Sequence, residues 1–194
     1  MTQKLVSLLA DFATLFSYTW YKDYPIAPIH REWGKRADWT IHLGVTFRRV
    51  SDLMGYFGHF ESGGRTDLVI RDNTKFPIAF CEWEWDCPYH EKFNEIDKLI
   101  RACKKENPKF CALFTYSEID KVDKVLMDLS ERWESSTPLL LILMHFQTIK
   151  GGRLFKEICY YQMCSGSYHC FRKQEPSPWN KDGSRWQTKG NSKK

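Results

Sequence analysis

Acidic residues alternate with large apolar residues in the segment IAFCEWEWD, residues 78–86. Side chains two residues apart on a β-strand share one face of the sheet, so Glu82 and Glu84 are predicted to point the same way. Asp67 opens the preceding apolar segment, TDLVIR, and a short turn joins the two segments. Antiparallel pairing around that turn places Asp67 opposite about residue 80, within reach of Glu82.

Carboxylates that lie close together on a partly buried sheet repel one another, and this repulsion must be compensated. Two like charges ~4 Å apart repel by about 4 kcal/mol at an effective dielectric constant of about 20. Either raised pKa values or a bound cation must relieve this repulsion. Carboxylate and carbonyl oxygens with water suit Mg²⁺ or Mn²⁺, and such an ion polarises a phosphate and lowers the pKa of a bound water. The pattern therefore favours metal-assisted hydrolysis of a phosphodiester.

A second interpretation of the same acids remains open. Alternation of charged and apolar residues is also typical of an edge strand with one face in solvent. However, the helix expected after this segment would cover one face of the sheet, and Asp67 enters the same patch as Glu82. We therefore favour a metal site over a solvated face.

The elements that would position these acids follow from the hydrophobic periods of the chain. We predict helices over 2–18, 44–55, 90–106 and 118–134, strands over 56–61, 66–71, 77–85, 109–116 and 138–149, and a hairpin over 154–172 that turns at Ser165-Gly166. Residues 19–43 are predicted to be irregular. Short links make the first three strands an antiparallel meander, and the helix over 90–106 crosses over to a parallel strand. The predicted fold class is α/β, with a mixed β-sheet flanked by helices.

The segment GGRTDLVIRDNTKFPIAFCEWEWD, with the helix and strand after it, resembles the PD-(D/E)xK nuclease superfamily, to which many restriction endonucleases belong. In that family an Asp begins one strand and a (D/E)-x-K tripeptide ends the next. Both acids bind the metal, and the Lys positions or activates the water. The resemblance covers roughly residues 44–149. It implies a restriction-endonuclease-like fold, Asp67 and Glu82 as ligands of Mg²⁺ or Mn²⁺, and the carbonyl of Trp83 as a further ligand.

The chain departs from the family pattern at two positions. Thr66 replaces the Pro of the motif, which is common in so loose a signature. Glu84 stands where the Lys is expected. A minority of restriction enzymes have Glu-x-Glu there, and Glu84 would then act as the base that activates water. Otherwise Lys92 or Lys98 on the following helix takes the role of the Lys, or the site is inactive.

The composition of the chain agrees with one globular domain. It has 194 residues, of which 15% are aromatic, and a formal net charge of +5. We predict one domain over 1–175 and a flexible basic tail over 176–194.

Seven cysteines without paired spacing favour a reducing compartment. Lys4 and Asp11 interrupt the first apolar segment, and the longest apolar run, 138–146, is too short to span a bilayer. We therefore predict a cytoplasmic protein without a membrane partner.

Four residues near the C-terminus suggest a zinc hypothesis: Cys159, Cys164, His169 and Cys170. Structural zinc sites usually contain close Cys pairs, whereas four residues separate the first two cysteines here. His169 and Cys170 are adjacent, and adjacent residues on a strand face opposite ways. We therefore favour partly buried thiols over a zinc site.

Together these features predict a metal-dependent endonuclease that hydrolyses DNA phosphodiester bonds. Its predicted catalytic residues are Asp67, Glu82, Glu84 and Lys98, of which Asp67 and Glu82 hold Mg²⁺ or Mn²⁺. Basic residues such as those of RACKKENPK, 101–109, would meet the phosphates. A homodimer would allow both strands to be cut, and the sequence leaves this open. The alternative is a catalytically inactive accessory protein with the nuclease fold that binds nucleic acid or protein.

Overall fold

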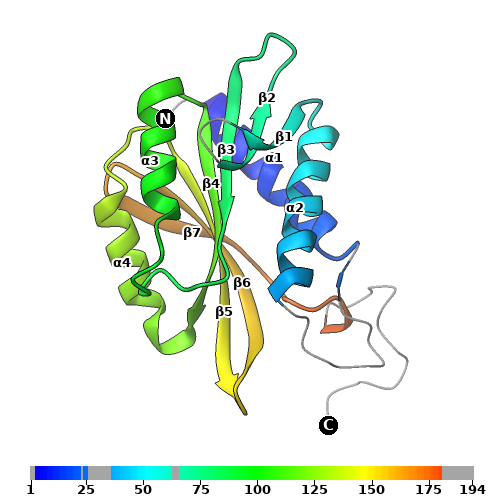
Figure 1. Ribbon diagram of the computed structural model, residues 1–194, viewed down its shortest axis with the longest axis vertical. Helices are drawn as coiled ribbons and strands as arrows, with labels where there is room; N and C mark the ends of the chain where they lie inside the picture. The colour runs from blue at the N-terminus through cyan, green and yellow to red at the C-terminus, as the bar shows by residue number, and fades with distance from the viewer. Residues whose placement is uncertain (1–2, 23, 26–35, 63–65, 181–194) are drawn as a thin grey trace.

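One mixed β-sheet organises the residues that the structure describes, which are 3–22, 24–25, 36–62 and 66–180 (Figure 1). The computed structural model places seven strands there in the order β1 to β7, so neighbours in sequence are also neighbours in the sheet. The central pairs β3–β4 and β4–β5 are parallel, and the pairs on either side are antiparallel. The predicted α/β class and mixed sheet are confirmed.

The strands are β1 (Phe57–Ser62), β2 (Thr66–Arg71), β3 (Pro77–Trp83), β4 (Phe110–Glu118), β5 (Leu139–Ile149), β6 (Gly152–Cys164) and β7 (Ser167–Gln174). β4 and the first part of β5 are continuously buried, because both faces of these central strands are covered. The hairpin between β6 and β7 turns where the sequence predicts. Ser165 and Gly166 both have positive φ, as a two-residue type I′ turn requires.

Two pairs of helices cover the two faces of the sheet (Figure 1). On one face, α1 (Gln3–Trp20) and α2 (Arg36–Leu53) pack around a core rich in aromatic side chains. On the other face lie α3 (Glu95–Glu106) and α4 (Val122–Arg132), each within a crossover between parallel strands. Short 3₁₀ helices cover Ile119–Lys121 and Pro178–Asn180. None of the described helices is both long and apolar enough to cross a membrane.

The start of α2 differs from the prediction. The helix begins at Arg36, inside the segment predicted to be irregular, of which 26–35 lie outside the described residues. Its buried face includes His42 and Thr46 beside Trp39 and Phe47. Polar residues on a buried helical face weaken the hydrophobic period. The first two turns of this helix therefore could not be predicted from the hydrophobic pattern of the sequence.

The start of α3 also differs from the prediction, because two turns come before it. The N–H of His90 donates to the carbonyl of Cys87, and the N–H of Phe93 donates to the carbonyl of His90. The helix itself begins at Glu95. Its end agrees with the prediction, since Asn107 adopts the left-handed conformation that closes a helix.

The packed part of the chain continues past the predicted domain boundary at residue 175. Nε1 of Trp20 donates to the carbonyl of Pro176 at 2.8 Å. The rings of Tyr24 and Trp179 are in edge contact, with centroids 5.3 Å apart. Residues 176–180 therefore belong to the folded unit, and the rest of the predicted tail, 181–194, lies outside the described residues.

Candidate active site

Asp67 and Glu82 meet across the β2–β3 pair. The register pairs Leu68 with Cys81, so the next step along the ladder sets Asp67 opposite Glu82. Cross-strand neighbours of this kind have Cβ atoms about 4.5–5.5 Å apart. Phe80, two residues before Glu82, packs in the core beneath α3, so both acids lie on the face that α3 covers.

The first turns of α3 bring a lysine and a third acid to the same place. Nζ of Lys98 lies 3.3 Å from Oε2 of Glu82 and 3.3 Å from Oε1 of Glu95. Glu95 and Lys98 are three residues apart and therefore project from one side of the helix. The helix dipole also favours an acidic side chain in this first turn. Asp67, Glu82, Glu95 and Lys98 are named the carboxylate cluster below.

The carboxylate cluster is largely withdrawn from water. The side chain of Glu82 is 0% exposed, that of Glu95 is 6% exposed, and that of Lys98 is 29% exposed. The N–H of Trp83 donates to Oδ2 of Asp67 at 2.9 Å. Oε1 of Glu82 is buried and has no hydrogen-bond partner among the described residues. A buried carboxylate oxygen without a donor costs free energy unless it is protonated or binds a cation.

Burial raises the pKa of both strand acids, and the charge of a neighbouring carboxylate adds to each rise. Burial, together with the charge of Asp67, raises the pKa of Glu82 to about 8. Burial also raises the pKa of Asp67, and the Trp83 N–H, the charge of Lys98 and a hydrogen bond with Glu82 offset only part of that rise. Burial opposes the charge on Lys98, but the charges of Glu82 and Glu95 raise its pKa overall. When all three acids are ionised, the cluster carries an excess of two negative charges.

In the presence of a chelator, the free energy of unfolding should fall as the pH rises from about 5 to about 8. The Glu82 carboxyl loses its proton near pH 4.5 in the unfolded chain but keeps it up to about pH 8 in the folded chain. The unfolded state therefore binds fewer protons across this window, so its relative free energy decreases as the pH rises. We expect a loss of about 3 kcal/mol that Glu82→Gln removes. Urea titrations at successive pH values measure this, and identical pH dependence of the two proteins would contradict it.

Glu84 lies apart from the carboxylate cluster. β3 ends at Trp83, and Oε1 of Glu84 lies 2.7 Å from Nη2 of Arg36, whose Nη1 is 3.7 Å from Asp86. Arg36 is the first residue of α2, the helix that packs on the opposite face of the sheet. The structure does not bring Glu84 beside Glu82 as strand alternation predicts, because the strand ends first.

Three of the four predicted catalytic residues are together, namely Asp67, Glu82 and Lys98. Of the two helix lysines considered, Lys92 precedes α3 and is exposed. Glu95 is the member of the cluster that sequence reasoning missed. Its spacing of three residues from Lys98, within a predicted helix, is the sequence signal that could have identified it.

The donor set of the cluster suits a hard divalent cation. Asp67 and Glu82 offer carboxylate oxygens, the ligands that Mg²⁺ and Mn²⁺ prefer. The buried Oε1 of Glu82 lacks a donor in the described part of the chain, and a divalent ion would cancel the excess charge of the ionised cluster. Lys98 lies beside these oxygens, where its ammonium group could hold a water or a phosphate oxygen.

Comparison with known proteins adds little to this geometry. No family model matches the chain, and no curated protein matches it. Among solved structures it is similar to the YaeQ protein from Xanthomonas axonopodis pv. citri, with 9% sequence identity and a TM-score of 0.28 over 62% of this chain and 70% of that chain. A superposition of that quality carries no argument about fold or function. Function must therefore be inferred from the residues themselves.

Proposed function

We propose that this protein is a metal-dependent endonuclease of the PD-(D/E)xK kind that hydrolyses DNA phosphodiester bonds. The observation that carries the proposal is the excess of acids over lysine in the carboxylate cluster, where Oε1 of Glu82 has no donor among the described residues. A divalent cation would supply the missing charge and take that oxygen as a ligand. The order of strands β2 and β3, helix α3 and strand β4 around the cluster agrees with the resemblance to the family.

Each member of the cluster has a role in this proposal. Asp67 and Glu82 would hold Mg²⁺ or Mn²⁺, which supplies a water of lowered pKa and stabilises charge on the phosphate. The Trp83 N–H fixes the orientation of the Asp67 carboxylate. Lys98 would orient the attacking water or a phosphate oxygen, and Glu95 positions Lys98. We assign no catalytic role to Glu84, because Arg36 binds its carboxylate.

Two further features support a nucleic-acid substrate and a reducing compartment such as the cytoplasm. Exposed basic side chains on and next to α3 would attract a phosphate backbone; they are Lys92, Arg101, Lys104, Lys105 and Lys109. All seven cysteines are free. Free thiols are the ordinary state of cysteine in reducing compartments.

The alternative is an inactive protein with a nuclease-like fold that binds nucleic acid or protein. One contact favours it. Lys98 already lies 3.3 Å from both Glu82 and Glu95, so the cluster is partly neutralised without a metal. The remaining charge would then be relieved by the proton on Glu82, which has a raised pKa.

Nicking of supercoiled plasmid separates the two functions. We expect nicking that requires Mg²⁺ or Mn²⁺ and stops in a chelator, because Asp67 and Glu82 act through the ion. DNA binding, measured by fluorescence anisotropy in Ca²⁺, should weaken at least about tenfold between roughly 50 and 200 mM salt as phosphate contacts are screened.

Each other outcome has a defined meaning. Salt-dependent binding without nicking in either ion would favour the inactive nucleic-acid-binding protein. Absence of both binding and nicking would favour a protein-interaction role. Nicking that persists unchanged in the chelator would contradict the metal-dependent mechanism.

A further inference from the structure

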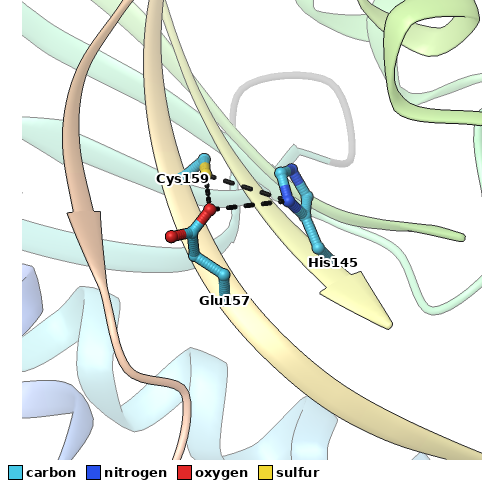
Figure 2. Close-up of side chains that lie close together, drawn as sticks. All are labelled: His145, Glu157 and Cys159. Carbon is cyan, nitrogen blue, oxygen red and sulfur yellow. Dashed lines mark hydrogen bonds and ion pairs between the residues drawn. The ribbon is translucent and has the colours of Figure 1, made fainter. Parts of the chain in front are cut away.

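A second group of ionisable side chains lies on β5 and β6 (Figure 2). Sγ of Cys159 lies 3.0 Å from Oε2 of Glu157 and 3.9 Å from Nδ1 of His145. The remaining pair, Nδ1 of His145 and Oε2 of Glu157, is also 3.9 Å apart. Figure 2 shows the three side chains pointing toward one another from adjacent strands. They are named the His–Glu–Cys group below.

Strand pairing brings the His–Glu–Cys group together. His145 is paired with Glu157, and Glu157 and Cys159 are two residues apart on β6, so all three side chains share one face. The register shifts between His145 and Phe146, and irregularities of this kind redirect side chains. β4 separates these strands from β3, so the group is distinct from the carboxylate cluster and its function is independent of the one proposed above.

The three ligand types are those of protein zinc sites. Zn²⁺ binds Cys thiolate, His nitrogen and carboxylate oxygen at about 2.0–2.3 Å, so tetrahedral angles put ligand atoms about 3.3–3.6 Å apart. The observed separations of 3.0, 3.9 and 3.9 Å lie on both sides of that range. Small rotations of the side chains would therefore place all three ligand atoms around one ion. Two anionic ligands and a neutral imidazole also match the charge of Zn²⁺.

His145 turns its Nδ1 atom toward the other two ligand atoms. Nδ1 lies 3.9 Å from Oε2 of Glu157, beyond an ordinary N–H···O hydrogen bond, and makes only a long contact of 3.9 Å with Sγ of Cys159. The His145 side chain is 12% exposed. An imidazole nitrogen that faces a carboxylate and a thiol is placed as a metal ligand would be.

A catalytic cysteine is the competing interpretation of the same three residues. A reactive Cys needs access to solvent and a lowered pKa. Cys159 is 0% exposed. A coordinated metal ion, by contrast, deprotonates a buried thiol directly. The environment of Cys159 therefore favours a metal ligand over a nucleophile.

We propose that His145, Glu157 and Cys159 bind Zn²⁺ through three protein ligands, with a fourth position open to water on the exposed side of Glu157. The side chain of Glu157 is 36% exposed, which gives the ion a route from solvent. On binding, the Cys159 thiol releases its proton to solvent. Glu157 exchanges its contact with Nζ of Lys173, at 3.2 Å, for the metal. Three protein ligands with one open position is the arrangement of catalytic zinc sites.

Titration of the full chain with Co²⁺ tests the proposal, because Co²⁺ reports its own ligands spectroscopically. We expect tetrahedral ligand-field bands and a thiolate-to-cobalt charge-transfer band that saturate at one equivalent and are removed by added Zn²⁺. Co²⁺ at the carboxylate cluster would have no thiolate ligand and would not contribute to the charge-transfer band. Cys159→Ser and His145→Gln should each weaken Zn²⁺ binding by more than about 100-fold, the upper end for loss of outer-shell partners. Cys170→Ser is the matched control, since the Cys170 thiol donates to the Arg172 carbonyl instead, and it should bind normally.

Lys173→Met provides a second test, in which Zn²⁺ binding is expected to become tighter instead of weaker. Removal of the competing ammonium group should tighten Zn²⁺ binding about twofold to fivefold, as measured by competition with a chromophoric chelator. Urea unfolding shows whether each variant folds. The zinc site is wrong if the wild type gives no charge-transfer band or if Cys159→Ser retains it. Weaker Zn²⁺ binding by Lys173→Met would also count against it.

Discussion

Glu82→Gln should lower the rate of metal-dependent plasmid nicking by about 10³-fold or more. The amide keeps the shape of the side chain but cannot supply an anionic oxygen to the ion. Loss of one preorganised electrostatic contact typically lowers the catalytic rate 10²- to 10³-fold. In Glu82→Gln the ion that stabilises the transition state is lost as well. Glu84→Gln is the matched control, since it makes the same chemical change two residues away at an ion pair whose Arg36 is 56% exposed. Only a small effect is expected there.

Electron paramagnetic resonance measures Mn²⁺ binding directly. It shows whether a variant fails to bind the ion or binds it but fails in the reaction that follows. Glu82→Gln should fail to bind the ion that the wild type and Glu84→Gln bind. Equal nicking by Glu82→Gln and the wild type would remove Glu82 from the site. A larger loss in Glu84→Gln would instead favour the Glu-x-Glu form of the motif, with Glu84 as the base.

Lys98→Met should lower the free energy of unfolding by about 3 kcal/mol at pH 8 in a chelator. The substitution leaves the buried Glu82 and Glu95 without their shared cation, and breaking a buried ion pair by removal of one partner typically costs 3–5 kcal/mol. At pH 5 the loss should be smaller, because Glu82 is then protonated in the folded chain. Urea unfolding at both pH values measures the difference.

Lys92→Met is the matched control for this experiment. Lys92 is exposed and lies just before α3, so its loss should change the stability by less than about 0.5 kcal/mol. A Lys98→Met protein as stable as the wild type at pH 8 would show that Lys98 does not neutralise the cluster. A loss of equal size at both pH values would contradict the raised pKa of Glu82.

The sheet could be predicted from the sequence because its strands carry strong local signals. Continuous apolar runs identify β4 and β5, and the turn at Ser165-Gly166 fixes the last hairpin. The pairing of β2 with β3 follows from the short link between them, so Asp67 and Glu82 could be placed together. Their common face was predictable because alternation holds through β3.

The parts that could not be predicted depend on tertiary contacts. The first turns of α2 have a weak hydrophobic period, because His42 and Thr46 are buried among aromatic neighbours. No turn-forming residue marks the end of β3 at Trp83 in the sequence. Strand alternation therefore predicts Glu84 beside Glu82, although Glu84 lies beyond the end of the strand. Glu95 gains its place only when α3 packs over β3 and brings it to Lys98 and Glu82.

The point at which β3 stops also limits how this chain could change by single mutations. Glu84→Lys would give residues 82–84 the (D/E)-x-K sequence of the family that the chain resembles. The new ammonium group would nevertheless stand beside Arg36, two cations in close contact, and would not reach Glu82. On this backbone the Glu84→Lys change alone is therefore expected to restore the sequence of the motif without placing its ammonium group at the carboxylate cluster. The length of β3 therefore decides whether a lysine two residues after Glu82 can serve the carboxylate cluster.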